Sequence, residues 1–486
     1  MIQTELAIIG AGPAGMAAAQ TAANHGVQVT IIDEQATPGG QFLRQPPRHF
    51  EVSDWLGGKA YRDGKELLAR ASGNPDLRWI MQSTVAGILD PATDDAGKKF
   101  TLVLERNGEE NKSGNGTNQP QVVSAGCVLI APGCYDLPVA FPGWDLPGVM
   151  ATGGIQAFIK SQRFIPGERF LFVGSHPLQL VVADQIVRAG GNVAGVLFAQ
   201  SRSQALRLLR NPSTVLRNAD KLAQTAAILW RLRKARVPVK FNQTLLRANG
   251  EGCLQSVTTV PIGPNGDLLS QAAQDIACDR LGICFGFLTS SELARQVGVD
   301  CTWDASRGGW ITQHDEGMLS SVPGVYVAGE ITGVAGWDVA ALEGQLAALD
   351  CAARLGKISP QQARTLSTLP HQQLRQRNRF ARLLGRLAWL DASLFDQLMS
   401  DSVTLCKCEE LTVGYLRELL QQNPHITTAN SAKLLSRAGM GLCQGRYCHF
   451  SLTRLLAGQL GVPENDVGGF TARFPAKPVA IDKLLP

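Results

Sequence analysis

The chain has 486 residues, of which 44% are hydrophobic and 18% charged, and its formal net charge is +5. This balance excludes wholesale disorder, because a disordered chain has too few apolar residues to form a core. No stretch approaches the roughly 18 consecutive apolar residues of a membrane-spanning helix, and the N-terminus has no basic segment of the kind that opens a secretory signal. We therefore expect a cytoplasmic protein of two to four domains, with any membrane association made through partners. Its 11 cysteines are then thiols or metal ligands rather than disulfides.

The positive charge is concentrated in one segment. Residues 201–240 contain ten basic residues and one acidic residue, Asp220, so the segment alone carries +9. No nucleic-acid recognition motif accompanies it, and we expect no nucleic-acid partner. A solvated helical face is the plain interpretation, and a docking surface for an acidic partner is the sharper one.

A glycine motif opens the first predicted unit. Residues 5–10 are predicted to form a buried strand, 13–25 a helix and 27–33 a second strand, an order that implies a parallel sheet. The turn between the first strand and the helix reads Gly10, Ala11, Gly12, Pro13, Ala14, Gly15. Such a turn lets the backbone approach a pyrophosphate, and the helix N-terminus adds amide donors. Asp33, or Glu34 if the register slips by one, stands where an acid would bind the ribose. The sequence therefore predicts a dinucleotide site.

Later segments resemble the two-dinucleotide-domain flavoproteins with the glutathione-reductase-like fold, over residues 1–350. The matching positions are Gly40 and Gln41 on the flavin side, Val85 at the adenine, Ala131 and Gly133 in a turn after a strand, and Gly329 and Glu330 in the late motif that contacts the ribityl chain. Glu330 replaces the aspartate of that family and is one methylene longer. The resemblance implies an α/β fold and bound FAD.

The second nucleotide turn of that fold is degraded here. Its positions read Gly174, Ser175, His176, Pro177, Leu178, Gln179. Only the first glycine is present, His176 would fill the space of a pyrophosphate, and Gln179 replaces the glycine that packs the helix on its strand. The next strand ends at Gln200 with no acid for a ribose, although Arg202 is a candidate for a 2′-phosphate. The sequence argues against a working NAD(P)H site.

Two absences narrow the chemistry further. No cysteine lies near residues 36–45, where disulfide reductases of this fold keep a redox pair, so thioredoxin-reductase-type chemistry is disfavoured. No arrangement of acid, base and nucleophile can be recognised, and we assign no catalytic residue.

Four cysteines form the most informative motif. Cys406, Cys408, Cys443 and Cys448 lie within 43 residues as C-x-C followed by C-x4-C. Thiolates ligate iron–sulfur clusters and structural zinc. Thr412 is expected to cap a helix at 413–422, and a second helix is expected at 431–441, before a Gly-rich turn whose amides can point at sulfur. The spacing fits a cluster better than zinc, and zinc or unligated thiols are the alternatives. The pattern is similar to the bacterioferritin-associated-ferredoxin-like [2Fe-2S] domain.

The expected organisation has six segments. They are an FAD-binding domain in two parts (1–155 and 291–368), a degenerate NAD(P)-type domain (156–290), an Arg-rich helical linker (369–400), a small helical [2Fe-2S] domain (401–456) and an extended tail (457–486). A polar, Gly/Asn-rich loop is expected at 106–120.

A flavoprotein body followed by such a cysteine module resembles the α (A) subunits of heteromeric FAD-dependent amine and amino-acid dehydrogenases. The family includes subunits of opine oxidase, hydrogen cyanide synthase, and proline and hydroxyproline dehydrogenases. The segments that carry the resemblance are 38–44, 141–154, 236–241, 406–412, 439–448 and 470–485.

This family resemblance implies an electron-transfer role within a complex. A D-amino-acid-oxidase-like flavoprotein β subunit would oxidise the substrate, and many members add a small ferredoxin-like γ subunit. Electrons would pass through FAD and the [2Fe-2S] cluster to a respiratory acceptor. The alternatives are a self-contained NAD(P)H:acceptor oxidoreductase and a non-catalytic nucleotide-binding scaffold. Opines, proline, hydroxyproline, glycine and sarcosine-like amines stay open as substrates.

Overall fold

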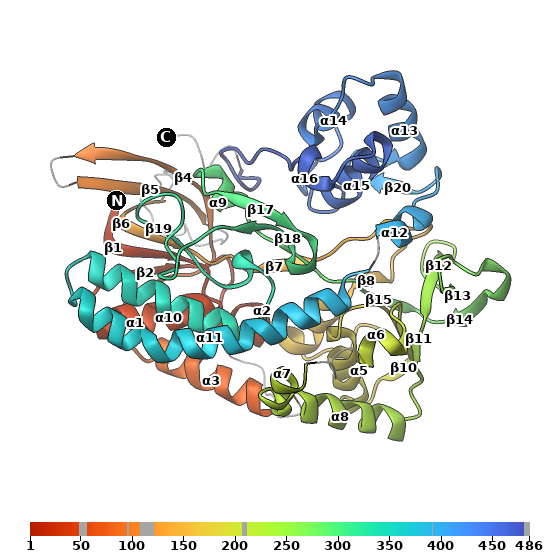
Figure 1. Cartoon of the computed structure of the whole chain (residues 1–486), viewed down its shortest axis with the longest axis horizontal. Helices are drawn as coiled ribbons and strands as arrows, with labels where there is room; N and C mark the ends of the chain where they lie inside the picture. Colours follow the sequence, from red (N-terminus) through yellow and green to blue (C-terminus); the bar gives the residue numbers. More distant parts are fainter. Residues whose placement is uncertain (48–55, 95–96, 107–120, 207–210, 391, 481–486) are drawn as a thin grey trace, which may run out of the picture.

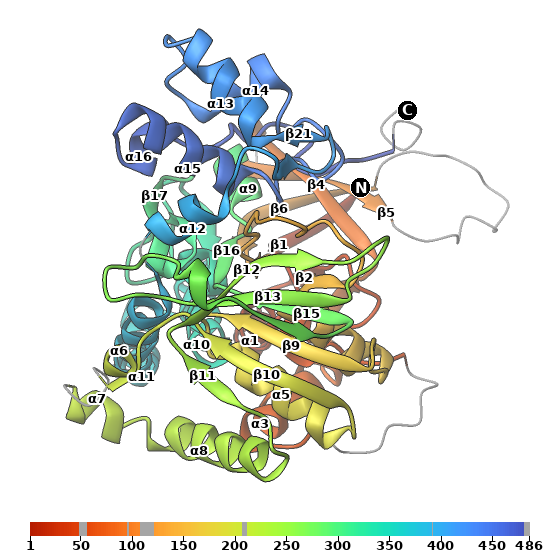
Figure 2. The same ribbon diagram turned by 90° about the vertical axis from the view of Figure 1, so that its right-hand side faces the viewer.

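The computed structural model describes residues 1–47, 56–94, 97–106, 121–206, 211–390 and 392–480 (Figure 1). The loop expected at 106–120 lies outside these ranges from residue 107 on. Two α/β domains make up the body, and the cysteine module forms a lobe at one end of the molecule (Figures 1 and 2).

The first domain is built on a seven-stranded sheet of order β3-β2-β1-β6-β5-β4, with β19 added beside β6. Its elements are β1 (Ile2–Ile9), α1 (Pro13–Asn24), β2 (Val29–Ile32), α2 (Gly40–Leu43), α3 (Lys59–Ser72), β3 (Leu77–Ile80), β4 (Ser83–Asp94), β5 (Gly97–Arg106), β6 (Gln121–Ile130) and β7 (Cys134–Asp136). Strand β1 pairs in parallel with β2 and β6, whereas β5 is antiparallel to β4 and β6. The strand–helix–strand order predicted for residues 5–33 is confirmed, with the first strand beginning at Ile2.

The chain returns to this domain after the second one. The returning elements are α9 (Glu292–Gln296), β17 (Cys301–Asp304), β18 (Gly309–Thr312), β19 (Val325–Val327) and α10 (Trp337–Arg354). Helix α10 crosses α1 so closely that a Cβ on Gly344 would lie 2.0 Å from the carbonyl oxygen of Ala14. The Ala-rich face of α1 and this glycine allow the close contact, which fixes the N-terminal end of α1 against the body.

The second domain has a five-stranded parallel sheet of order β11-β10-β9-β15-β8 and an antiparallel sheet of order β12-β13-β14. Its elements are β8 (Val149–Ala151), α4 (Thr152–Ala157), β9 (Arg169–Gly174), α5 (Leu178–Arg188), β10 (Asn192–Phe198), α6 (Arg202–Leu206), α7 (Pro212–Leu216), α8 (Ala219–Lys234), β11 (Val239–Phe241), β12 (Gln243–Asn249), β13 (Ser256–Pro261), β14 (Gln274–Ala277), β15 (Arg280–Cys284) and β16 (Phe287–Thr289). Strand β9, helix α5 and strand β10 follow one another as a parallel strand–helix–strand unit.

A long helix joins the body to the cysteine module. Helix α11 (Pro360–Ala388) begins with a capping box, in which Ser359 Oγ accepts from the Gln362 amide and the Gln362 side chain accepts from the Ser359 amide. This capping box starts the helix ten residues before Pro370, which lies inside it. The linker boundary expected at 368 therefore falls within α11, and the boundary expected at 155 falls within α4.

The cysteine module contains α12 (Ala392–Leu398), β20 (Thr404–Cys406), β21 (Leu411–Thr412), α13 (Val413–Gln422), α14 (Ala429–Ser436), α15 (His449–Leu460) and α16 (Glu464–Val467). Thr412 caps α13 as predicted, because its Oγ1 accepts from the Tyr415 amide at 3.3 Å. The helix expected at 431–441 ends earlier, at Ser436, where Arg437 takes a left-handed conformation. Helix α15 continues past the boundary expected at 456, and α16 follows it, so the part of the tail without helix begins at Gly468.

Candidate functional site

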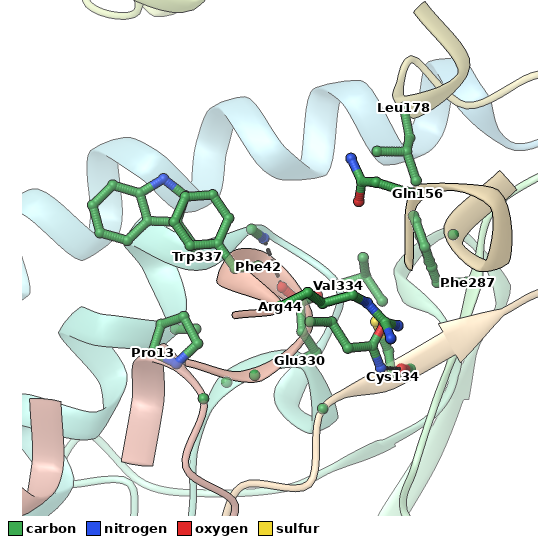
Figure 3. Close-up of a pocket in the computed structure, with 18 of the residues that line it drawn as sticks. Pro13, Phe42, Arg44, Cys134, Gln156, Leu178, Phe287, Glu330, Val334 and Trp337 are labelled. Carbon is green, nitrogen blue, oxygen red and sulfur yellow. Dashed lines mark hydrogen bonds between the residues drawn. The ribbon is translucent and has the colours of Figure 1, made fainter. Parts of the chain in front are cut away.

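A cavity of about 1340 Å³ lies between the two α/β domains (Figure 3). Most of the residues predicted to bind a nucleotide line it: Gly10, Gly12, Pro13, Ala14, Asp33, Glu34, Gly40, Gln41, Val85, Ala131, Gly133, Gly329 and Glu330. The fold thus brings together segments that are up to 320 residues apart in the sequence. Ala11 and Gly15 lie behind this lining rather than in it.

The turn after β1 leaves its amide end open to the cavity. Gly10 has φ +106°, and a Cβ there would lie 2.2 Å from the carbonyl oxygen of Ala131. A Cβ on Gly15 would lie 1.9 Å from the carbonyl oxygen of Gly10, so both glycines are required by packing. At Gly12, by contrast, the nearest atom to a Cβ is 4.0 Å away. Helix α1 has Pro13 in its first turn and no side-chain cap, so this helix end can accept an anion.

The two acids after β2 have different partners. Asp33 accepts hydrogen bonds from the amides of Ala11, at 2.6 Å, and Gln35, at 2.7 Å. Burial nevertheless raises the pKa of Asp33 above its ordinary value. Glu34 forms an ion pair with Lys477 from the far C-terminal segment. Asp33 therefore faces the glycine turn, in the register expected, while Glu34 faces the tail.

Glu330 is turned toward the backbone. Its carboxylate accepts from the amides of Ala335, at 3.1 Å, and Gly336, at 3.0 Å. Burial raises the pKa of Glu330 to about 7. A second buried acid, Glu343, accepts from the Gly329 amide at 2.8 Å, and burial raises its pKa to about 8. The late glycine turn is thus held by two carboxyl groups, of which the sequence motif indicated only the first.

A group of buried charges on the flavin side of the cavity was missed from the sequence. Lys160 donates to the Phe42 carbonyl at 2.7 Å, and burial, with a contribution from Arg44, lowers the pKa of Lys160 to about 7. Burial also raises the pKa of Asp136, which faces Arg44. Figure 3 draws Arg44 and Cys134 among the residues that line this part of the cavity. Arg44 falls within the segment 38–44 that carried the family resemblance, but nothing in the sequence pattern distinguished Lys160.

The turn after β9 has no open amide end. The Ser175 and His176 amides both donate to the Cys284 carbonyl at 2.9 Å, and the Leu178 amide donates to His176 Nδ1 at 3.2 Å. Burial lowers the pKa of His176 to about 4, so the ring is neutral, and it packs edge-on against Phe287 with centroids 4.9 Å apart. The amides that a pyrophosphate needs are bonded within the protein.

Helix α11 covers the same turn. The strand expected to end at Gln200 ends at Phe198. Gln200, two residues later and near the place of a ribose-binding acid, donates through Nε2 to the carbonyls of Ser175 and, at 3.1 Å, Leu387. Leu387 lies in the last turn of α11. The C-terminal end of this helix therefore sits against the degraded turn, and Leu384, Gly385 and Trp389 line the adjoining part of the cavity.

The four predicted cysteine ligands lie in two pairs. The Cys406 thiol is within hydrogen-bond reach of Cys448, and Cys408 is within reach of Cys443. The hydrogen bond with Cys448, followed by the amides of Gly439, Glu409 and Cys408, lowers the pKa of Cys406 to about 5, and the pKa of Cys448 rises. Cys406 and Cys448 are buried, whereas Cys408 is exposed. Among the described residues, no three His, Cys, Asp or Glu side chains converge on one point as ligands of a single ion would.

Strand β7 separates the large cavity from the cysteine module. Cys134 lines the cavity, and its carbonyl accepts from Gln41 Nε2 at 2.6 Å. The next side chain, Tyr135, points to the opposite face, as strand geometry requires. There it lies 5.9 Å from the Arg446 guanidinium, and it lines a cavity of about 30 Å³ together with His449. One strand thus has the candidate flavin site on one face and the cysteine module on the other.

The module is fixed to the body near its first cysteines. Lys407 Nζ lies 3.8 Å from the centroid of the Trp144 ring and donates to the Trp144 carbonyl at 3.0 Å. The Trp144 indole donates to the Thr404 carbonyl at 2.6 Å. Because cation–π contacts and buried hydrogen bonds resist sliding, the cysteine pairs are held at one position relative to β7.

The fold and the open glycine turn define the class of protein. The pyridine nucleotide-disulphide oxidoreductase family model matches residues 4–344, and the chain belongs to this family of FAD-dependent oxidoreductases. In the described ranges, no helix has the length and apolar character needed to cross a bilayer.

Relatives with full-length similarity are more specific. The chain is 30% identical to hydrogen cyanide synthase subunit HcnB of Pseudomonas protegens, over 99% of this chain and 97% of that one. It is also 30% identical to the A subunit of opine oxidase from Agrobacterium tumefaciens, over 99% and 91%. Among solved structures, L-proline dehydrogenase from P. horikoshii superposes with a TM-score of 0.71 at 19% identity, over 100% of this chain and 80% of that one. Thioredoxin reductase from T. acidophilum, with a TM-score of 0.51 at 19% identity, covers 73% of this chain and 99% of its own. The structural matches support the fold.

Proposed function

We propose that this chain is the electron-transfer subunit of a heteromeric dehydrogenase that oxidises an amino acid or secondary amine. Substrate oxidation takes place on a D-amino-acid-oxidase-like β subunit, with a small ferredoxin-like γ subunit in some assemblies. This chain passes the electrons through FAD and a [2Fe-2S] cluster toward a respiratory acceptor. The names of the relatives, subunits of opine oxidase and hydrogen cyanide synthase, support an assembly of this kind.

The residues of the large cavity fit an FAD. The uncapped end of α1 and the open face of Gly12 would hold the pyrophosphate, Asp33 the adenosine ribose, and the backbone at Val85 the adenine. Gly40, Gln41, Ala131 and Gly133 line the flavin side, with Gly329 and Glu330 beside the ribityl chain. Bound flavin accepts an electron pair and releases electrons singly, which suits a one-electron cluster.

The cysteine pairs fit a two-iron cluster better than one zinc ion. A [2Fe-2S] cluster takes four thiolates, two on each iron, whereas zinc takes four ligands around one point. The pairing of Cys406 with Cys448 and of Cys408 with Cys443 corresponds to the first arrangement. Backbone amides beside Cys406 would stabilise the negative charge on sulfur.

Strand β7 is the observation that carries the proposal. Electrons leaving the candidate flavin site need to cross only this strand, from Cys134 to Tyr135, to reach the side chains around Arg446. A reductase that took hydride from NAD(P)H would instead need the turn after β9, whose amides are already bonded. We therefore rank the self-contained NAD(P)H:acceptor oxidoreductase below the electron-transfer subunit.

The first experiment is the absorption spectrum of the anaerobically purified chain, before and after NADH and NADPH are added. We expect flavin and cluster bands that neither nicotinamide bleaches, with about two iron atoms and two acid-labile sulfides per chain. Rapid bleaching would establish the self-contained reductase. Stoichiometric zinc without iron would contradict the cluster.

One observation favours the nucleotide-binding scaffold as the second candidate. The Glu330 carboxylate accepts from the amides of residues 335 and 336, so fewer of its acceptor sites are left for a ribityl chain. A simpler adenine nucleotide would need only the glycine turn and Asp33. A colourless chain that releases an adenine nucleotide on denaturation would favour this candidate.

A further inference from the structure

The proposed function leaves one segment without a role. Residues 468–480, here called the C-terminal strap, follow α16 and contain no helix or strand. The strap leaves the cysteine module and runs back along the first domain. Its sequence belongs to the stretch 470–485, one of the segments that carry the family resemblance.

One end of the strap is bound to the cysteine module. The Phe470 ring is stacked on His449, the residue after Cys448, with centroids 4.5 Å apart, and the Phe470 amide donates to His449 Nε2 at 3.3 Å. The Arg295 side chain, from the returning part of the first domain, donates to the Phe470 carbonyl. Phe470 is buried, so this end is anchored where the module meets the body.

The other end reaches the nucleotide cavity. The Phe474 ring fills the space beside Gly87, where a Cβ would lie 2.5 Å from it. The Ala476 amide donates to the Ala86 carbonyl at 2.6 Å, next to the backbone of Val85. Lys477 pairs with Glu34 and itself lines the cavity. The contacts of Phe474, Ala476 and Lys477 therefore join the strap to strand β4 and to Glu34, which border the adenosine end of the cavity.

We propose that the strap closes the adenosine end of the cavity and that Lys477 is a binding residue for the adenine nucleotide. The inference rests on the proposed nucleotide site. Asp33 and Glu34 place two carboxylates beside a ligand that carries phosphate charges, and like charges repel. Lys477 offsets the negative charge of Glu34 at the rim of the cavity. Without it, the same site would disfavour an anionic ligand.

The strap also links the cysteine module to the nucleotide. Six residues lie between Phe470 at the module and Lys477 at the cavity, so a nucleotide that holds Lys477 also holds the segment leading to His449. Since coupling between two sites is reciprocal, nucleotide binding and docking of the module stabilise each other.

The test uses ADP, the fragment that FAD and simpler adenine nucleotides share, added to the full chain after its nucleotide is removed. Lys477→Met should weaken ADP binding about five- to tenfold by titration calorimetry, and Lys477→Arg should stay within about twofold of wild type. The matched control is Lys357→Met, because Lys357 pairs with Glu5 at 2.8 Å on the same domain and neither residue lines the cavity. This control should bind ADP like wild type.

Hydrogen exchange gives a second readout that needs no variant. ADP should slow exchange of the Ala476 amide, while iron content stays unchanged. Equal ADP affinity in wild type and Lys477→Met, or an Ala476 amide that ADP leaves unprotected, overturns the role of the strap alone. A wild-type chain that binds no ADP overturns the nucleotide site itself.

Discussion

The turns after β1 and β9 occupy equivalent places, each at the carboxyl end of a strand that pairs in parallel with both of its neighbours and each followed by a helix. In the first, Gly12 faces open space and α1 has no side-chain cap. In the second, the His176 ring accepts from the Leu178 amide at the start of α5, and the Cys284 carbonyl accepts from the amides of Ser175 and His176. The same supersecondary structure thus presents its amides to a ligand in one domain and uses them internally in the other.

This difference shows that the number of glycines is only part of the signal. A helix N-terminus binds an anion through unsatisfied amides, and any internal acceptor that reaches them removes the site. Burial keeps His176 neutral, so its ring can accept from the Leu178 amide and this hydrogen bond persists at physiological pH. The contact of Gln200 with the Leu387 carbonyl then places α11 over the same turn.

The strongest way to break the comparison is to close the first turn. Gly12→Val places a branched side chain in the cavity without a clash in the protein, because nothing lies within 4.0 Å of its Cβ position except Gly40 Cα. We expect nucleotide affinity to fall at least about 1,000-fold, or about 4 kcal/mol, with iron content unchanged. Calorimetry with ADP and analysis of the bound nucleotide after gel filtration measure this loss.

The matched control is Gly458→Val on the exposed side of α15, where no atom lies within 4 Å of the Cβ position. It should retain the nucleotide and gain only a small amount of helix propensity, because valine is a somewhat better helix former than glycine. Wild-type affinity in Gly12→Val would show that the ligand of this cavity does not use the turn.

A second prediction concerns the carboxyl group that completes the first site. The pKa of Glu330 is about 7 in the folded state against an ordinary value of 4.5. Between these two pKa values, Glu330 keeps its proton in the folded state, whereas the unfolded chain has released it. Protonated Glu330 contributes about 3 kcal/mol to the free energy of unfolding. This contribution is fully present below about pH 4.5 and is lost as the pH rises through 7.

Glu330→Gln removes this loss, so its melting temperature should fall less than that of wild type between pH 5 and pH 8. Glu343 acts in the same direction and keeps part of the pH dependence in the variant. The measurement is thermal unfolding across this range on the nucleotide-free chain. Parallel curves for the two proteins would show that Glu330 is ionised in the folded state throughout.

A third prediction tests the path of electrons from the candidate flavin site to the cysteine module. Tyr135→Leu removes the aromatic ring beside Arg446 while leaving Cys134 and the strand pairing of β7 with β16 in place. Transfer from flavin to cluster should slow about tenfold, a change of about 1.4 kcal/mol in barrier, and Tyr135→Phe should stay near wild type. Anaerobic stopped-flow absorption at the flavin and cluster bands distinguishes a slower transfer rate from a loss of either cofactor. Equal rates in all three proteins would remove Tyr135 from the path.

Local patterns predicted the geometry of the turn after β1, because that geometry depends on backbone contacts. Gly10 and Gly15 are required by contacts shorter than 2.5 Å to a Cβ, and such requirements leave a fixed sequence motif. The Thr412 cap is equally local, since its acceptor and donor are three residues apart. The linker boundary expected at 368 falls inside α11, because the capping box at Ser359 starts that helix at Pro360.

The groups that sequence reasoning missed depend on long-range burial. Lys160 has a pKa of about 7 only because α4 and the residues after it pack it against Phe42 of another segment. Glu343 is a polar residue on an otherwise buried helix, and its role appears only once the Gly329 amide lies opposite. Lys477 is 443 residues from Glu34 in the sequence and reaches the cavity only in the folded chain, so no local pattern indicates it.

The smallest expected effect comes from repairing the second turn. His176→Gly combined with Gln179→Gly restores two glycines of the motif, yet we expect no NADH or NADPH binding tighter than about 1 mM by calorimetry. The amide of residue 175 would still donate to the Cys284 carbonyl, and Gln200 would still hold the last turn of α11 over the site. The helix would also lose its cap on Leu178, at a cost of about 1 kcal/mol. Micromolar binding with flavin bleaching in this variant would instead mean that the side chains of His176 and Gln179 alone had closed the site. The hydrogen bonds of the backbone amides within the protein would then be a consequence of those side chains and not a separate cause.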